Sequence, residues 1–237
     1  MELHKSIYLL ALLLLNLTVN AQTKKKDYLV TFQTPYGDIK AVLHDQTPLH
    51  KQNFLALVKQ GFYDSLLFHR VINKFMIQGG DPNSKRAKKG EVLGNGGGDM
   101  PRISAEFLPE LFHKKGALAA ARDSNPEKKS SACQFYMVQG AVWNDSSLNA
   151  QTARIPGARP PTALQRDVYK TLGGSPHLDG NYTVFGQVVS GLAIIDSIAA
   201  QPRDAKNRPL KDLRLVVSAK KMRKKKIKKL YAYDFGG

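Results

Sequence analysis

The stretch "FHRVINKFMIQGGD", from Phe68 to Asp81, decides how this sequence folds. Its two apolar runs are separated by Asn73-Lys74 and followed by two glycines, which is typical of two short strands joined by a turn. Arg70 and Gln78 lie among the apolar residues. A buried strand cannot hold an unpaired guanidinium, and an exposed strand does not need so much apolar area. The stretch therefore indicates an apolar surface that carries one fixed positive charge and one amide.

Short strand-like runs continue on both sides. "DYLVTFQT" and "GDIKAVL" flank a Pro-Gly turn, and "GALAAAR", "ACQFYMV", "YTVFGQVV" and "LRLVVSAKKM" follow later. Two substantial helices are predicted, one in residues 47–63 with Thr47 as its cap and Gly61 as its stop, and one in 190–200 capped by Ser190. Many short strands with two helices favour an antiparallel barrel or sandwich over an alternating βαβ sheet.

Residues 141–175 lack a clear core pattern. The segment contains the one Trp of the chain, Trp143, and the run "LQRDVYKTLGG", which predicts a helix that ends at Gly173. We interpret the segment as one long insertion within the domain, because it is too short and too polar to form a core of its own.

The N-terminus has the pattern of a secretory signal peptide. Lys5 precedes an apolar run from Ile7 to Leu15, and small residues surround Ala21. As a helix this run would span about 14 Å, roughly half of a ~30 Å hydrocarbon core. We expect cleavage after Ala21 and export, with the periplasm favoured over the medium and no transmembrane anchor left. An uncleaved anchor is the alternative.

Basic residues concentrate near both ends. The net charge is +17, with lysine-rich runs at 24–26, 85–89 and 220–229. We divide the chain into a signal peptide (1–21), a basic linker (22–27), one domain (28–220) and a basic C-terminal extension (221–237). The basic runs are either solvated loops and tails or a surface for an anionic partner. No nucleic-acid motif is present, so nucleic acid is not an expected partner.

Common catalytic patterns are missing from the sequence. The six His residues form no H-E-x-x-H motif, no G-x-S-x-G occurs, and "GNGGGD" lacks the Lys-Ser/Thr of a phosphate loop. Cys133 is the single cysteine, so no internal disulfide can form, and its neighbours do not indicate activation. No metal site and no cofactor are predicted.

The motifs together resemble the cyclophilin family of peptidyl-prolyl cis-trans isomerases. "FHRVINKFMIQGGD" is similar to the family's signature strand pair, and "ACQFYMV" and "HLDGNYTVFGQV" follow in the family's order. The resemblance covers about 28–139 and 177–220. It implies a mostly β fold, a closed eight-stranded antiparallel barrel capped by two α-helices, with 141–175 as an addition.

The resemblance also implies a set of site residues. Arg70 and Gln78 would be catalytic, and Ala121 and Arg122 would bind the main chain of an extended peptide. The sequence departs from many family members at His177, which stands where they carry Trp. Further substrate-binding residues would be Phe75, Met76, Gln134, Tyr136, His177, Leu178 and Tyr182.

The expected chemistry explains the odd composition of the opening stretch. Rotation about an X-Pro amide crosses a barrier of roughly 18–20 kcal/mol because it destroys resonance. No covalent bond changes, and a fixed donor such as Arg70 can bond the prolyl nitrogen only in the twisted state. Two other functions stay open: a non-catalytic module that binds proline-containing segments, and a basic adaptor with the barrel as scaffold.

Overall fold

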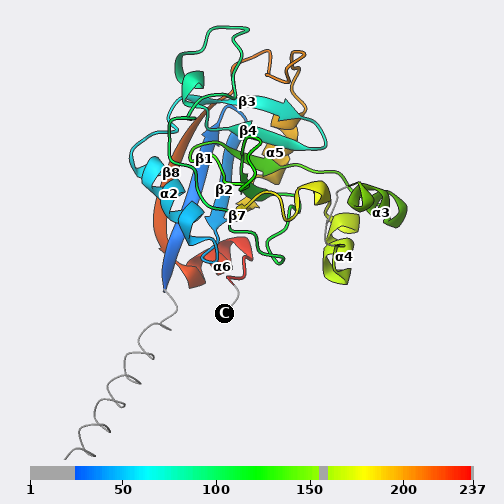
Figure 1. Ribbon diagram of the computed structural model, residues 1–237. Coiled ribbons are helices and arrows are strands. Elements are labelled where there is room, and N and C mark those ends of the chain that lie inside the picture. The colour runs from blue at the N-terminus through cyan, green and yellow to red at the C-terminus, as the bar shows by residue number, and fades with distance from the viewer. Residues whose placement is uncertain (1–24, 155–159, 236–237) are drawn as a thin grey trace, which may run out of the picture.

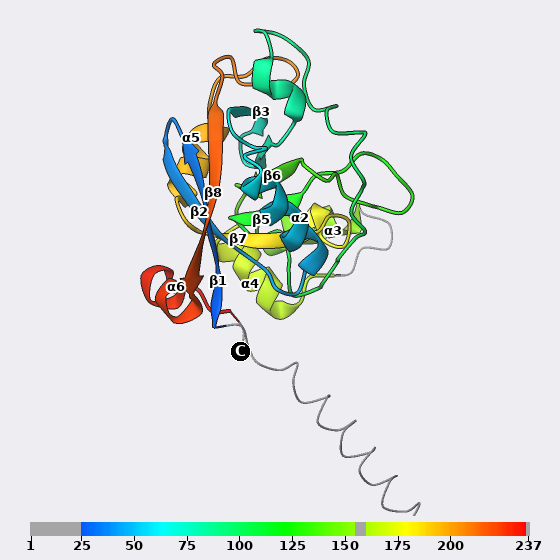
Figure 2. The same cartoon turned by 90° about the vertical axis from the view of Figure 1, so that its left-hand side faces the viewer.

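The computed structural model describes residues 25–154 and 160–235, so the predicted signal peptide lies outside the described residues (Figures 1 and 2). Eight antiparallel strands close into a barrel in the order β1-β2-β7-β5-β6-β4-β3-β8. The predicted barrel is confirmed. Its strands are β1 (Lys26–Thr34), β2 (Gly37–Leu43), β3 (Leu66–Ile72), β4 (Met76–Gly79), β5 (Ala117–Ala120), β6 (Phe135–Val138), β7 (Val184–Ser190) and β8 (Arg214–Arg223).

The barrel interior is filled by alternate residues of the strands, as the period of two in a strand requires. Phe32 packs against Phe54 and Phe135 at ring-centroid distances of 6.0 and 5.4 Å. Phe54 comes from α2 (Pro48–Lys59), and Ile195 from α5 (Leu192–Ala199) joins the same buried cluster. The two predicted helices therefore close the barrel.

The predicted caps of these helices are only partly right. Thr47 occupies the N-cap of α2, but its hydroxyl donates to the carbonyl oxygen of His44 at 3.4 Å and caps no backbone N–H. The prediction of Ser190 as the cap of α5 is wrong, because Ser190 is the last residue of β7. Gly191 is the N-cap instead, with a φ of +92°, a conformation that favours glycine.

Among the described residues, three further α-helices lie outside the barrel wall. In the insertion, α3 (Asp145–Ala153) and α4 (Ala163–Thr171) contact each other beside the barrel (Figure 1). The helix expected up to Gly173 is α4, whereas α3 was not predicted. Nor was α6 (Lys224–Tyr231), which forms within the basic extension. Short 3₁₀ helices, η2 (Pro82–Arg86) and η3 (Pro176–Leu178), precede two loops that reach the site.

The folded domain is longer than the predicted 28–220. Lys26 in β1 pairs with Arg223 in β8, so the end of the expected linker and the start of the expected extension belong to the barrel. Both strands continue into these lysine-rich runs, because an exposed strand face tolerates lysine. In the part of the chain that the structure describes, no helix is long and apolar enough to cross a membrane.

Candidate active site

A β-bulge in β3 sets the direction of Arg70. Phe68 pairs with Gly79 and Arg70 pairs with Gln78, so β3 carries one extra residue, His69, at this point. Without the bulge, Phe68 and Arg70 would share a face. Instead Phe68 is 1% exposed inside the barrel, whereas Arg70 lies on the outside. Because of the bulge, this apolar strand can hold a guanidinium: the charged side chain points to the outer face and not into the core.

The outer face of the barrel carries a second apolar cluster. Across β3, β4, β6 and β5, Arg70 pairs with Gln78, Gln78 with Tyr136, and Tyr136 with Ala119, which places the four residues in one row. Residues of the same strands at alternate positions form the apolar part of this face, which packs separately from the interior. Its buried members are Met76, Ala117, Ala119, Ala121, Tyr136, Val138, Leu178 and Val184.

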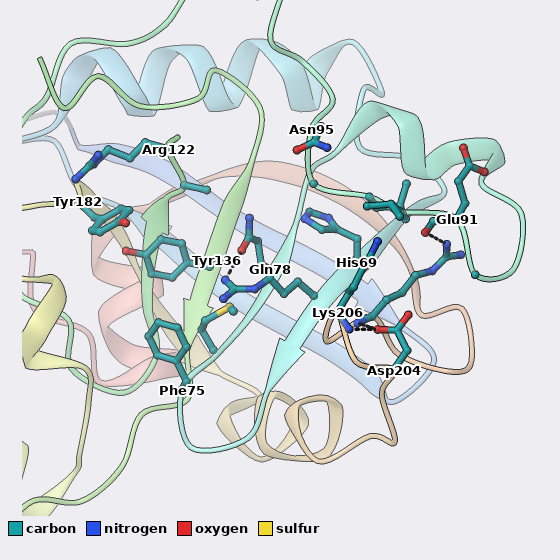
Figure 3. A pocket seen from close by; sticks show the side chains of 18 of the residues that line it. His69, Phe75, Gln78, Glu91, Asn95, Arg122, Tyr136, Tyr182, Asp204 and Lys206 are labelled. Carbon is teal, nitrogen blue, oxygen red and sulfur yellow. Dashed lines mark hydrogen bonds between the residues drawn. The ribbon is translucent and has the colours of Figure 1, made fainter. Parts of the chain in front are cut away.

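A cavity of about 310 Å³ opens on this face, and we call it the outer groove (Figure 3). Nine of the eleven predicted site residues line it: Arg70, Phe75, Met76, Gln78, Ala121, Arg122, Tyr136, Leu178 and Tyr182. Tyr136 and Tyr182 meet edge to face at 6.0 Å, and Figure 3 shows Phe75 on the other side of Tyr136. The Arg122 guanidinium lies over the Tyr182 ring at 4.7 Å. The structure thus forms an apolar floor beside a fixed cation.

Arg70 is held as an accessible, unneutralised charge. Its Nη1 donates to Oε1 of Gln78 at 3.1 Å, and in the described part of the chain it makes no ion pair. Partial burial of the guanidinium lowers the pKa of Arg70, though an arginine stays charged at any physiological pH. Its remaining N–H groups are available to a ligand in the groove.

Gln134 borders the outer groove without lining it. Nε2 of Gln78 donates to its Oε1 at 3.2 Å, and its own Nε2 donates to the carbonyl oxygens of Gly94 and Gly96 at 2.9 and 3.0 Å. Gln134 lines a second cavity of about 350 Å³, which shares Gln78 and Arg122 with the first. The two cavities therefore make one continuous path, and Gln134 fixes the loop between them.

His177 does not line the outer groove, in contrast to the prediction. Its ring packs against Phe75 at a centroid distance of 5.2 Å, and burial lowers its pKa. η3 begins with Pro176 and carries Leu178, which does line the groove. The turn therefore presents Leu178 to a ligand and places His177 against Phe75.

The sequence did not reveal the far side of the groove. Two loops form it, the backbone from Gly90 to Asn95 and the turn with Asp204 and Lys206, which Figure 3 shows on the opposite side of Gln78 from Phe75. Arg208 holds the loops together, because its Nη1 donates to the carbonyl oxygens of Lys88 and Glu91. More than 100 residues separate these loops in the chain, so no local pattern could connect them.

His69, the extra residue of the bulge, also lines the groove. Its side chain is 3% exposed, and neither ring nitrogen has a hydrogen-bond partner among the described residues. Burial lowers the pKa of His69 to about 4. The positive charge of Arg70 lowers this pKa further, whereas the negative charge of Asp81 raises it. At neutral pH His69 is therefore uncharged, and Arg70 stays the positive charge at this point of the groove.

This geometry agrees with comparisons against known proteins. The family profile of "Cyclophilin type peptidyl-prolyl cis-trans isomerase/CLD" matches residues 29–220, most of the chain. The chain belongs to the cyclophilin-type peptidyl-prolyl cis-trans isomerase family. Isomerase activity follows from this membership, and proline-containing peptides are the family's substrates.

Relatives and solved structures support the same assignment. A Staphylococcus haemolyticus protein named "Putative peptidyl-prolyl cis-trans isomerase" is 33% identical over 82% of this chain and 92% of its own length. A Streptococcus pyogenes protein named "Putative bifunctional phosphatase/peptidyl-prolyl cis-trans isomerase" is 35% identical over 78% of this chain, which spans 37% of that longer protein.

Among solved structures, a Cryptosporidium parvum cyclophilin-type isomerase aligns with a TM-score of 0.60 at 24% identity, over 82% of this chain and 98% of that one. A second crystal structure of it, obtained in the presence of the dipeptide Ala-Pro, gives a TM-score of 0.56 at 25% identity, over 81% and 99% of the two chains.

Proposed function

We propose that this isomerase accelerates X-Pro isomerisation during the folding of exported proteins, with Arg70 stabilising the twisted imide. The observation that carries the proposal is the accessible guanidinium of Arg70 beside the apolar floor of Phe75, Met76 and Tyr136. The proline ring would lie on that floor, because an apolar surface suits its hydrocarbon ring. The Ala-Pro dipeptide present with the Cryptosporidium relative is a ligand of the same chemical class.

The catalytic step needs a donor that acts only half-way through rotation. In the planar imide the prolyl nitrogen has no free lone pair, whereas in the twisted state it pyramidalises and can accept a hydrogen bond. Arg70 would donate that bond, so its contribution appears in the transition state and not in the ground state. Gln78, which already orients Arg70, would bind the substrate backbone.

Magnitudes show what else the groove must supply. A rate increase of about 10⁴-fold requires about 5.4 kcal/mol. One hydrogen bond from a charged donor contributes about 1.5–3 kcal/mol net. The remainder has to come from holding the proline and its carbonyl in a preorganised, partly desolvated site. The aromatic rings on the outer face are suited to this task, because they exclude water from one side of the imide.

Turnover of an X-Pro peptide by the Arg70→Ala variant tests the catalytic proposal. We expect kcat/KM to fall at least ~100-fold, about 2.7 kcal/mol, with an unchanged circular dichroism spectrum. Arg70→Lys keeps the charge but loses the rigid fork, so it should recover only part of the loss. Arg223→Ala, which removes an exposed arginine at the end of β8 that does not line the groove, is the matched control and should keep full activity. Equal rates for wild type and Arg70→Ala would reject the role of Arg70.

Export is supported by the sequence of residues 1–21 alone. Mass spectrometry of the mature protein from its native host, after separation of periplasm and medium, is the direct test. We expect a mature N-terminus at Gln22 in the periplasmic fraction. A protein that retains Met1 and sediments with the membrane would instead favour the uncleaved anchor.

We further propose that the basic C-terminal region binds an anionic surface. Lys225, Lys226 and Lys229 on α6 are exposed, and the start of β1 adds Lys26 at the same end of the barrel. Figures 1 and 2 show α6 at the end opposite to β3 and β4, so binding there leaves the outer groove free. Sedimentation with phosphatidylglycerol vesicles should be strong at low salt, weak at high salt and lost in the K225E/K226E/K229E variant. Equal binding to neutral vesicles would contradict the proposal.

A further inference from the structure

A continuous chain of hydrogen bonds connects the insertion with the floor of the outer groove. It begins at Tyr169 in α4, whose hydroxyl donates to Oδ2 of Asp179 at 2.6 Å. Oδ1 of Asp179 lies 2.8 Å from Nδ1 of His113 and also accepts the backbone N–H of His113 at 2.9 Å. Nε2 of His113 lies 2.9 Å from the hydroxyl of Tyr136. Three of the four residues, all except Tyr136, belong to no predicted site.

The chain has a defined direction. A carboxylate only accepts, so Nδ1 of His113 must carry the proton that faces Asp179. In the neutral imidazole Nε2 is then the acceptor, and the hydroxyl of Tyr136 donates to it. The side chains of Tyr169 and His113 are 0% and 1% exposed, and Tyr136 is 5% exposed, so these three members are shielded from water, whereas the Asp179 side chain is 26% exposed.

The insertion is packed so that Tyr169 cannot move freely. Its ring meets Phe112, the neighbour of His113 in the chain, at a centroid distance of 5.4 Å, and Leu148 from α3 completes the buried cluster. Trp143 packs on this cluster, and its Nε1 donates to the carbonyl oxygen of Gly174 at 2.9 Å. The first member of the chain is therefore fixed by both helices of the insertion.

We propose that the insertion positions the floor of the outer groove, with Tyr169, Asp179 and His113 as positioning residues for the ring of Tyr136. The inference depends on the proposed role of Tyr136 as the floor beneath the substrate proline. A phenylalanine at position 136 could lie in the same place, but nothing polar would hold it. Tyr136 makes the position of the floor depend on α4, about 30 residues further along the chain.

A double-mutant cycle in kcat/KM tests this coupling. Tyr169→Phe removes the first bond of the chain and Tyr136→Phe removes the last, while both keep their rings. We expect each single change to lower kcat/KM about fivefold, the range of one buried hydrogen bond, chiefly through KM. The double variant should be no worse than Tyr136→Phe alone, because Tyr169 acts only through that hydroxyl.

Tyr63→Phe is the matched control. It removes another fully buried tyrosine hydroxyl, which donates to the carbonyl oxygen of Cys133 at 3.3 Å away from the outer groove. It should reduce thermal stability as much as Tyr169→Phe while leaving KM unchanged. Strictly additive losses in the cycle, or a Tyr169→Phe variant with the KM of wild type, would overturn the proposal.

A readout independent of activity separates this inference from the proposed catalytic role. Long-range ¹H–¹⁵N spectra of the histidine rings should show His113 protonated at Nδ1 and unprotonated at Nε2. The opposite tautomer would refute the chain of bonds even if the kinetics agreed. Conversely, an unaltered rate in Arg70→Ala would reject the catalytic proposal while leaving the tautomer and the cycle as they are.

Discussion

The inner and outer faces of β3, β4, β6 and β5 are built from alternate residues of the same strands, yet they serve different ends. Phe135 and Met137 point into the barrel, where they belong to the buried core and Phe135 packs against the ring of Phe32. Tyr136, between them, points outward beside Arg70 and Gln78. Both faces are apolar, but only the outer one carries a charge and hydrogen-bonding groups. Stability and catalysis should therefore be separable at neighbouring positions of one strand.

The largest effect is expected from the inner face. Phe135→Ala removes a ring that contacts Phe32, Phe54, Tyr63 and Phe68, and it should lower the free energy of unfolding by about 3–5 kcal/mol. Denaturant unfolding followed by circular dichroism measures the loss. At low temperature, where the variant is still folded, KM should stay close to that of wild type. A large rise in KM of the folded variant would contradict the separation of the faces.

Acid should act on two histidines whose pKa is lowered in the folded protein, the partly buried His44 and the buried His69. Burial lowers the pKa of His44 and of His69 to about 4, against 6.5 in an unfolded chain. Between these values the unfolded chain binds protons that the folded one rejects, so stability is lost as pH falls from 6.5 to 4. We expect a loss of about 2–4 kcal/mol, measured by urea unfolding at each pH. The H44Q/H69Q variant should flatten this slope, and an equally steep slope would refute the assignment.

A smaller effect is expected from the amide on the outer face. Gln78→Ala removes the acceptor that orients Arg70 at 3.1 Å and the donor to Gln134 at 3.2 Å. We predict a fall of about tenfold in kcat/KM, or ~1.4 kcal/mol, with little change in the free energy of unfolding. Gln187→Ala, an amide that bonds backbone carbonyls away from the groove, is the control and should leave catalysis unaffected. Similar losses of kcat/KM in both variants would contradict a specific role of Gln78 in catalysis.

The smallest effect belongs to the rim of the groove. Arg122 lies over Tyr182 and its Nε donates to the carbonyl oxygen of Asn181 at 2.9 Å. Arg122→Ala should raise KM about two- to threefold without changing kcat, since an exposed cation–π contact contributes about 0.5–1 kcal/mol. Steady-state kinetics at several salt concentrations checks this. A fall in kcat would place Arg122 in the chemical step and not at the rim.

Much of the fold was predictable because strand alternation is local. The runs around Phe68 and Tyr136 show it clearly. Such runs predicted an antiparallel barrel or sandwich, and the family resemblance implied the closed eight-stranded barrel with two helices that the structure has. One element in lysine-rich sequence was missed, namely α6. Also missed was α3, although Asn144 and Ser147 form a capping box that marks its start.

The site was predictable where it lies on regular strands and unpredictable where it depends on loops. Arg70 and Gln78 share a register, so their proximity follows from the hairpin. The bulge at His69, by contrast, determines the direction of the Arg70 side chain, and no residue type in the sequence predicts this bulge. The position of His177 against Phe75 depends on a 3₁₀ turn, which a family pattern alone does not reveal.

The outer groove runs along the side of a closed barrel, and this has a consequence for the polypeptides that can use it. A tunnel or a deep blind pocket would admit only chain ends or short peptides. A lateral trough accepts a loop laid across it, so a proline in the middle of a long nascent chain can be turned over without threading. The barrel itself never needs to open for such a substrate to bind.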